Sequence, residues 1–158
     1  MVGGVCVVQY MVDTSALAKY YHPEIGSSRV IALADDPSNV LFISRIGLVE
    51  IHSALARKVR TGELQVPACQ QALRRFYADL RRRKFRLIQS VSVHERQAIR
   101  LLTRKGPVFP LRTLDALQLS TALWLKSQQQ LDHFLCADPR LCEAAQQEGL
   151  SVINPEEP

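Results

Sequence analysis

Short apolar runs rich in β-branched residues alternate with helix-prone segments, and this alternation restricts the fold more than any other feature of the sequence. The runs typical of strands are residues 5–12, 39–44, 85–90, 132–137 and 150–154. The segments typical of helices are residues 16–21, 27–36, 45–60, 67–84, 92–105, 113–125 and 139–149. Strands that alternate with helices usually form a parallel sheet with helices on both faces. The sequence therefore predicts an α/β fold with a central, mostly parallel sheet.

Length and composition predict one globular domain over residues 1–158. A chain of 158 residues can bury a substantial core, and 47% hydrophobic against 22% charged residues is an ordinary composition for a folded protein. Residues 1–4 and 156–158 are expected to be terminal tails. Met11 offers an alternative start, in which case residues 1–10 either extend the first strand or form a tail.

The sequence contains neither a recognisable targeting segment nor a membrane span. The N-terminus lacks the basic region and cleavage pattern of a signal peptide, and no apolar run reaches about 18 residues. The cysteines have no spacing typical of a zinc site or a disulfide framework, and they are Cys6, Cys69, Cys136 and Cys142. Because reduced thiols are typical of the cytosol, we predict a cytoplasmic protein.

The net charge of +5 permits a polyanionic partner without requiring one. Much of the positive charge lies between Arg74 and Arg86, where seven residues are basic. Most of these side chains are expected to form the solvated face of a helix. A phosphate-binding role for some of them stays open.

Two aspartates directly follow predicted strands. Asp13 ends the first strand pattern and Asp138 ends the run 132–137, so both are expected at the carboxyl edge of the sheet, where open α/β sheets bind ligands. Each also has a structural interpretation, because both can cap the helix that follows, and Pro139 suits the first turn of such a helix. The sequence leaves both interpretations open.

Asp115 is harder to explain as a structural residue. It lies in a helix pattern that is apolar on nearly every side, with Thr113 as the candidate cap. A position in the first turn would stabilise its charge by only about 0.3–1 kcal/mol, which does not offset the burial of a carboxylate. The pattern predicts a cation beside Asp115, either a divalent ion or a basic side chain.

Glu50 is ambiguous from its helix pattern. The apolar stripe of residues 45–60 is formed by Leu48, Ile51, Leu55 and Val59, and a turn of 100° per residue places Glu50 on the opposite side. Periodicity thus predicts a solvated glutamate, unless that side of the helix faces a cleft.

The acids indicate a hard cation as the ligand. Carboxylates without neighbouring histidine or cysteine ligands are typical of magnesium or manganese sites. The histidines are dispersed and are expected to have surface or core roles, and they are His22, His52, His94 and His133. The sequence also lacks a Gly-rich phosphate loop, a nucleophile elbow and a zinc-protease motif.

The motifs "VDTSALAKYY", "ISRIGLVEIHSALARKVRTGEL", "LRTLDALQLSTAL" and "FLCADPRLCEAAQQEGLSVINP" together resemble the PIN-domain family, and within it the VapC-type ribonuclease toxins. The resemblance covers residues 5–155 and implies an α/β/α sandwich. It also implies that four acids gather around Mg²⁺ or Mn²⁺, and these are Asp13, Glu50, Asp115 and Asp138. In one departure, Cys136 stands where the family commonly has a hydroxyl residue, although Thr14 and Ser15 lie near Asp13.

The same resemblance implies a function. It predicts metal-dependent hydrolysis of RNA phosphodiester bonds by the toxin of a toxin–antitoxin pair, which forms a homodimer and is silenced by a small antitoxin whose tail crosses the acidic cleft. Three arginines are candidates for holding the RNA backbone beside Thr14 and Ser15, and these are Arg45, Arg112 and Arg140.

Two other functions stay open at this level. A PIN-like domain with weak or lost catalysis would serve as an RNA-binding or scaffold module, and the acids at all four positions argue against this. A receiver-like phosphoacceptor domain also gathers acids at strand ends, but the sequence offers a single acid after the first strand and no suitable late lysine.

Overall fold

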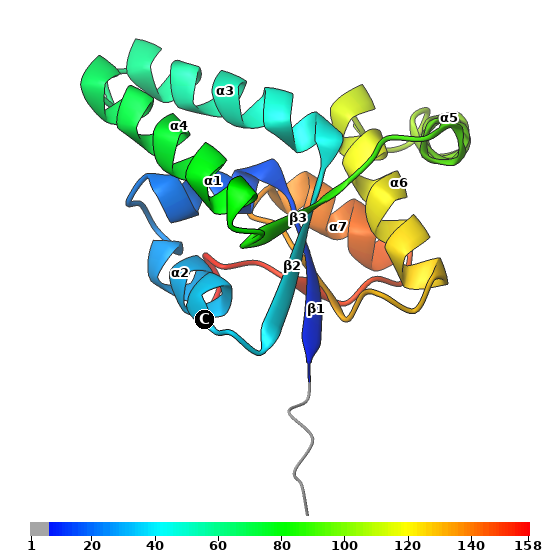
Figure 1. Ribbon diagram of the computed structural model, residues 1–158. Coiled ribbons are helices and arrows are strands. Elements are labelled where there is room, and N and C mark those ends of the chain that lie inside the picture. Colours follow the sequence, from blue (N-terminus) through cyan, green and yellow to red (C-terminus); the bar gives the residue numbers. More distant parts are fainter. Residues whose placement is uncertain (1–6) are drawn as a thin grey trace, which may run out of the picture.

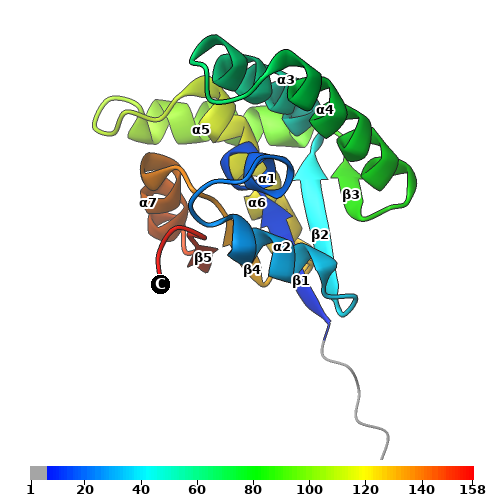
Figure 2. The same ribbon diagram turned by 90° about the vertical axis from the view of Figure 1, so that its left-hand side faces the viewer.

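The computed structural model describes residues 7–158 and contains one five-stranded sheet between two layers of helices (Figures 1 and 2). Its elements are β1 (Val8–Val12), α1 (Thr14–Tyr21), α2 (Ser27–Asp35), β2 (Asn39–Ser44), α3 (Arg45–Arg60), α4 (Val66–Arg81), β3 (Phe85–Ile88), α5 (Ser92–Lys105), α6 (Thr113–Ser127), β4 (His133–Leu135), α7 (Pro139–Gln147) and β5 (Val152–Ile153). The predicted α/β architecture is confirmed.

The strands lie in the order β3-β2-β1-β4-β5, and every neighbouring pair is parallel. Tyr10 of β1, for example, is in register with Leu41 on one side and with His133 on the other. The carboxyl ends of β2, β1 and β4 therefore meet at one edge of the sheet, with β1 in the middle. This edge is the place where a ligand site is expected in such a sheet.

Alternate residues of the strands point into two separate cores, as expected for strands that are buried on both faces. Tyr10 and Val12 join the core beneath α1, α2, α3 and α4, whereas Met11 joins the core beneath α5, α6 and α7. The completely buried Phe76 and Phe134 lie one in each core. The two cores hold the helices against both faces of the sheet, and the candidate site lies at the carboxyl edge of this sheet.

Most predicted boundaries agree with the structure within a few residues. Ser44 caps α3 as expected, with its hydroxyl accepting the Gly47 N–H at 3.2 Å. Two predictions are wrong. The helix expected to reach residue 84 ends at Arg81, because Arg83 has a φ of 58° and turns the chain into β3. Thr113 is not the cap of α6 but its first residue, and Arg112 occupies the cap position.

The terminal segments differ from expectation in part. Residues 1–4 lie outside the described residues, while positions 8–10 belong to β1 and pair with β2. Glu156 and Glu157, which the sequence places in a terminal tail, are held to the domain: Glu156 contacts the Lys19 ammonium, and the Glu157 carbonyl accepts from Arg29 at 2.7 Å. Within residues 7–158, no helix is both long enough and apolar enough to cross a membrane.

Candidate active site

The four predicted acids line one cleft of about 300 Å³ at the carboxyl edge of the sheet, hereafter the acidic cleft. Asp13 comes from the end of β1, Glu50 from α3, Asp115 from the first turn of α6, and Asp138 from the end of β4. Positions that are far apart in the sequence are thus brought to one place by the order of the strands.

Asp13 is the most buried of the four, with 5% of its surface exposed. It caps α1, and its Oδ2 accepts the Ser15 N–H at 2.9 Å and the Ser15 hydroxyl at 2.5 Å. Burial raises the pKa of Asp13, the two bonds from Ser15 oppose this rise, and the charge of Asp115 adds to it. The capping role and a place in the cleft, which the sequence treated as alternatives, apply to the same side chain.

The periodicity prediction for Glu50 is wrong. Glu50 is only partly exposed and lines the acidic cleft, together with the exposed Ser53 and Arg57 on the same side of α3. The Glu50 carboxylate accepts a hydrogen bond from the Thr14 hydroxyl at 3.1 Å and another from the Gln118 amide. Burial, followed by the charge of Asp13, raises the pKa of Glu50 to about 7.

Gln118 organises one wall of the cleft, and the sequence alone did not single it out. Its Nε2 donates to Glu50 and, at 3.2 Å, to the Thr14 hydroxyl, while its Oε1 accepts the Ser44 hydroxyl at 2.8 Å. The side chain is 1% exposed, so these bonds lie in a dry environment. In the sequence, the only hint of this role is that Gln118 is a polar residue one turn after Asp115 on a largely apolar helix.

Asp115 is half-buried, and its carboxylate accepts the backbone N–H of Arg112 at 3.3 Å. Burial raises its pKa, the Arg112 N–H lowers it, and the charge of Asp138 raises it again. In the described part of the chain, no side-chain nitrogen of a lysine or arginine comes within 4.0 Å of this carboxylate. The sequence predicted either a divalent ion or a basic side chain beside Asp115. No basic side chain is paired with this carboxylate in the structure, so the divalent ion is the alternative that stays open.

Asp138 caps α7, which is one of the two roles that the sequence left open. Its Oδ1 accepts the N–H groups of Arg140 at 2.9 Å and Leu141 at 3.2 Å, with Pro139 in the first turn. The same side chain lines the acidic cleft. Capping therefore fixes the carboxylate at the rim of the cleft.

The Ser15 hydroxyl lies beside Cys136, which occupies the position where the resemblance leads one to expect a hydroxyl residue. Besides donating to Asp13, it accepts the Ala137 N–H at 3.0 Å and lies 3.8 Å from the Cys136 thiol. Ser15 thereby joins the ends of β1 and β4. The Cys136 thiol is completely buried and lies 3.5 Å from the Asp138 carbonyl oxygen.

The basic residues agree only partly with expectation. Arg112 lines the acidic cleft, together with Arg57 and Arg60, which the sequence did not single out. Arg140 does not line the cleft, but its charge helps to lower the pKa of Asp115. Arg45 lies elsewhere and donates to the Gln89 side chain at 3.0 Å.

The donor set of the acidic cleft fits a hard divalent cation. Mg²⁺ prefers oxygen ligands, takes one or two carboxylates directly and keeps several waters. Within the described residues, no three of the four carboxylates place an oxygen within 4.8 Å of one another, so an ion bound there would keep water among its ligands. The unfavourable interactions that raise the pKa values of Asp13, Glu50 and Asp115 are those that a cation would relieve.

A tighter group of ligand atoms lies outside the cleft but fits a cation less well. His22, Glu24 and Glu63 place one ligand atom each within 4.8 Å of the others. The Lys58 ammonium contacts both glutamates, and its distance from Glu63 is 3.5 Å. The position that a metal ion would take is thus already occupied by a positive charge.

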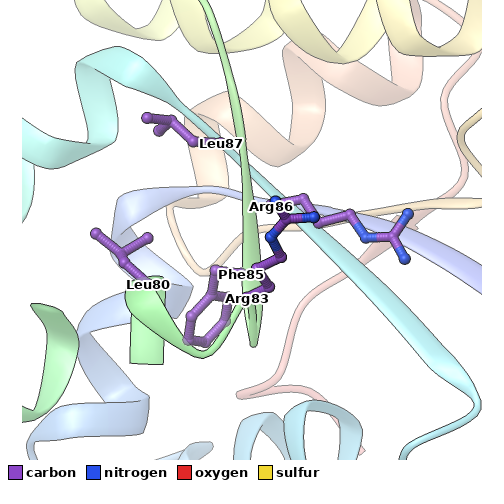
Figure 3. A pocket seen from close by; sticks show the side chains of 5 residues that line it. All are labelled: Leu80, Arg83, Phe85, Arg86 and Leu87. Carbon is purple, nitrogen blue, oxygen red and sulfur yellow. The ribbon is translucent and has the colours of Figure 1, made fainter. Parts of the chain in front are cut away.

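A larger cavity, of about 600 Å³, lies at the outer edge of the sheet beside β3 (Figure 3). Leu80, Phe85 and Leu87 line it together with the guanidinium-bearing side chains of Arg83 and Arg86. These side chains offer neither a carboxylate nor a nucleophile. The smaller acidic cleft, in contrast, offers both carboxylates and hydroxyls.

A sequence model of the PIN domain matches residues 10–147, which cover all four acids. The chain belongs to the PIN-domain family. The family resemblance drawn from the motifs is thereby confirmed, and the receiver-like alternative is wrong. A comparison with curated proteins finds no match for this PIN domain.

Several solved structures are similar in fold to this chain, and they include a toxin and a toxin–antitoxin complex. The toxin VapC20 of Mycobacterium tuberculosis, described as cleaving the sarcin–ricin loop, is 18% identical with a TM-score of 0.66 over 92% of this chain and 99% of that one. FitAcB of Neisseria gonorrhoeae is 18% identical with a TM-score of 0.62 over 92% and 97%. PAE2754 of Pyrobaculum aerophilum is 18% identical with a TM-score of 0.61 over 96% and 87%. At this identity the likeness shows the fold of the PIN domain.

Proposed function

We propose that this PIN domain is a Mg²⁺- or Mn²⁺-dependent endoribonuclease that hydrolyses RNA phosphodiester bonds. The observation that carries the proposal is the convergence of Asp13, Glu50, Asp115 and Asp138 on one cleft at the carboxyl edge of the sheet. Carboxylates that repel one another when ionised are costly to keep together unless a cation binds between them. Burial is the main cause of the raised pKa values of Asp13, Glu50 and Asp115, and the charges of neighbouring carboxylates add to it.

Asp13, Glu50 and Asp115 would hold the ion directly or through water, and Asp138 would complete the set of oxygen ligands or orient the attacking water. A bound divalent cation supplies an acidified water and stabilises negative charge on the phosphoryl oxygens. Ser15 and Gln118 keep Asp13 and Glu50 in place through the bonds described above. Arg57, Arg60 and Arg112 line the same cleft and would attract the phosphate backbone.

Several features favour a single-stranded or looped substrate. The cleft is about 300 Å³ in volume and is enclosed on one side by α3 and on another by α6. A backbone phosphate of an unpaired strand can enter such a space more easily than one held in a regular duplex. The net charge of +5 assists the approach of any RNA.

We further propose that the protein is the toxin of a toxin–antitoxin pair, acts in the cytoplasm and forms a homodimer. Support comes from the structural neighbours, which include VapBC2 of Rickettsia felis and a toxin–antitoxin complex of Klebsiella pneumoniae. The partner expected here is a small antitoxin that places a basic side chain against the acidic cleft, since a guanidinium satisfies carboxylates in the same way as a metal ion.

The test is cleavage of a panel of structured and unstructured RNAs by purified, partner-free protein, with Mg²⁺, with Mn²⁺ and with EDTA. We expect cleavage that requires the metal and disappears in the Asp13→Asn/Asp115→Asn double variant. Folded wild-type protein that binds Mn²⁺ and RNA without cutting any member of the panel would favour the alternative, a catalytically inactive RNA-binding module. A failure to bind any divalent ion would remove the proposed metal site altogether.

A further inference from the structure

A second cavity of about 310 Å³, hereafter the lysine groove, continues directly from the acidic cleft. The two cavities share five lining residues, which are Thr14, Ser15, Ala54, Arg57 and Asp138. Beyond them, the lysine groove is lined by Lys19 and Lys58 with their acidic partners. The acidic cleft thus continues into a depression whose lining contains paired lysines and glutamates.

Both lysines are unusually buried, with Lys19 4% exposed and Lys58 6% exposed. Lysines are rarely buried to this extent unless they are paired, and a buried ion pair contributes little net stability because both charges must be desolvated. Glu24 lies between the two ammonium groups, at 3.1 Å from that of Lys19 and in contact with that of Lys58. These three groups alone leave one positive charge, which Glu156 beside Lys19 and Glu63 beside Lys58 further neutralise.

A second, more distant carboxylate completes the pairing of Lys19. Glu156, in the turn after β5, lies 2.5 Å from the Lys19 ammonium, and 41% of its side chain is exposed. Although burial opposes it, the bonds to Glu156 and Glu24 raise the pKa of Lys19, so the lysine stays charged. Glu156 lies in the mouth of the groove, where solvent or a ligand can replace it.

We infer that the lysine groove is a subsite for a backbone phosphate next to the scissile one, and that this phosphate displaces Glu156 from Lys19. The inference rests on the proposed function, because the acidic cleft defines which phosphate is scissile. A phosphodiester group and a carboxylate each carry one negative charge, so the exchange leaves Lys19 neutralised. Lys58 keeps its partners Glu24 and Glu63 throughout.

Arg57 links the two cavities and supports this order of sites. It lines both the acidic cleft and the lysine groove, and it is exposed. An RNA strand that enters the acidic cleft along Arg57 therefore passes into the lysine groove with its next phosphate. Contacts of this kind fix the position of the strand without reading its bases.

The test measures binding of fluorescein-labelled octauridylate by anisotropy, in Ca²⁺ and over a range of salt concentrations. Because the subsite recognises the backbone, a homopolymer is a sufficient probe. Glu156→Gln should tighten binding about threefold, since the phosphate no longer competes with a carboxylate for Lys19. Lys19→Met should weaken binding and lower the slope of log K against log salt by about 0.7, the loss of one phosphate contact to a single strand.

Matched variants separate this effect from a general change of charge or stability. Glu157→Gln removes the same charge one residue away, where the side chain bonds Asn154, and should leave the affinity unchanged. Lys84→Met removes a lysine paired with Asp35 and serves as the control for Lys19→Met. In the Lys19→Met background, Glu156→Gln should bring no tightening, and Lys19→Arg should retain the wild-type salt slope.

Equal affinities of Glu156→Gln and Glu157→Gln would overturn the inference, as would an unchanged salt slope in folded Lys19→Met or the absence of octauridylate binding by the wild type. These outcomes are distinct from failure of the proposed function, because binding in Ca²⁺ is measured without cleavage. Metal-dependent cleavage with no Glu156 effect would leave the nuclease proposal standing alone.

Discussion

The side-chain amide of Gln118 on α6 donates a hydrogen bond to the carboxylate of Glu50 on α3, and this contact turns a residue on the polar side of a helix into part of the acidic cleft. The same amide bonds Thr14 and Ser44, so three separate elements meet at one buried side chain. The orientation of Glu50 therefore depends on a residue that would not itself touch the metal ion or the RNA.

Replacement of Gln118 by leucine should lower the affinity for Mn²⁺ and the cleavage rate together, by about 10- to 100-fold, because residues that orient metal ligands typically contribute this much. Isothermal titration with Mn²⁺ measures the affinity independently of activity. The exposed Gln146 on α7 provides the matched control, and Gln146→Leu should have no effect. An unchanged Mn²⁺ affinity in folded Gln118→Leu would contradict the role given to this amide.

Replacement of Asp13 by asparagine should abolish strong Mn²⁺ binding and at the same time raise the thermal stability of the metal-free protein at pH 7.5. Burial and the charge of Asp115 disfavour the ionised carboxylate, while asparagine can still cap α1. Calorimetric unfolding with EDTA and with Mn²⁺ measures both effects. Glu143→Gln, on the exposed face of α7, should change neither. A loss of stability in Asp13→Asn would show that the capping role outweighs the repulsion.

The stability of the metal-free protein should depend on pH through Glu50. Its pKa is about 7 in the folded protein against an ordinary value of 4.5, so the folded state binds more protons between these values. The free energy of unfolding should therefore fall as the pH rises from 4.5 to 7. Denaturant titrations in EDTA at several pH values measure this slope, and Glu50→Gln should flatten it. A slope that persists unchanged in Glu50→Gln would assign the effect to other acids.

Mn²⁺ binding should show the opposite dependence on pH. Because a metal ion binds the ionised carboxylate, the affinity should rise as the pH increases toward 7 and level off above it. Titration calorimetry at pH 5.5, 6.5 and 7.5 follows this rise, and proton release is measured by repeating the titrations in buffers of different ionisation enthalpy. An affinity that does not vary over this range would exclude Glu50 as a ligand.

Replacement of Ser15 by alanine should destabilise the protein by about 1–2 kcal/mol, because its hydroxyl joins Asp13 to the Ala137 N–H and both groups are left with one partner fewer. Ser38 donates its N–H and its hydroxyl to Asp36 as Ser15 does to Asp13, but it lies at an exposed site and its hydroxyl has no bond to a second strand. Ser38→Ala is therefore the matched control and should cost less. Equal losses for the two variants would mean that the link between β1 and β4 contributes nothing beyond the local turn.

Local pattern determined the order and type of the elements in this protein. The alternation of strand and helix patterns yields a parallel sheet whose neighbouring strands meet at one edge, and capping preferences place Asp13 and Asp138 at the ends of β1 and β4. The motif order also carried the family resemblance, which the match over residues 10–147 confirms. These features depend on residues that are close together in the sequence, so they can be predicted without the tertiary structure.

Only the tertiary structure decided which side of α3 faces the cleft. Periodicity separates apolar from polar residues but cannot distinguish a polar side turned to open solvent from one turned to a polar cleft, and Glu50 was misplaced for this reason. The sequence also did not predict the roles of Gln118, Lys19 and Glu156, because each role depends on a partner more than 60 residues away. The packing of distant elements determines which buried polar groups pair with one another. Short-range sequence patterns carry no information about such pairs.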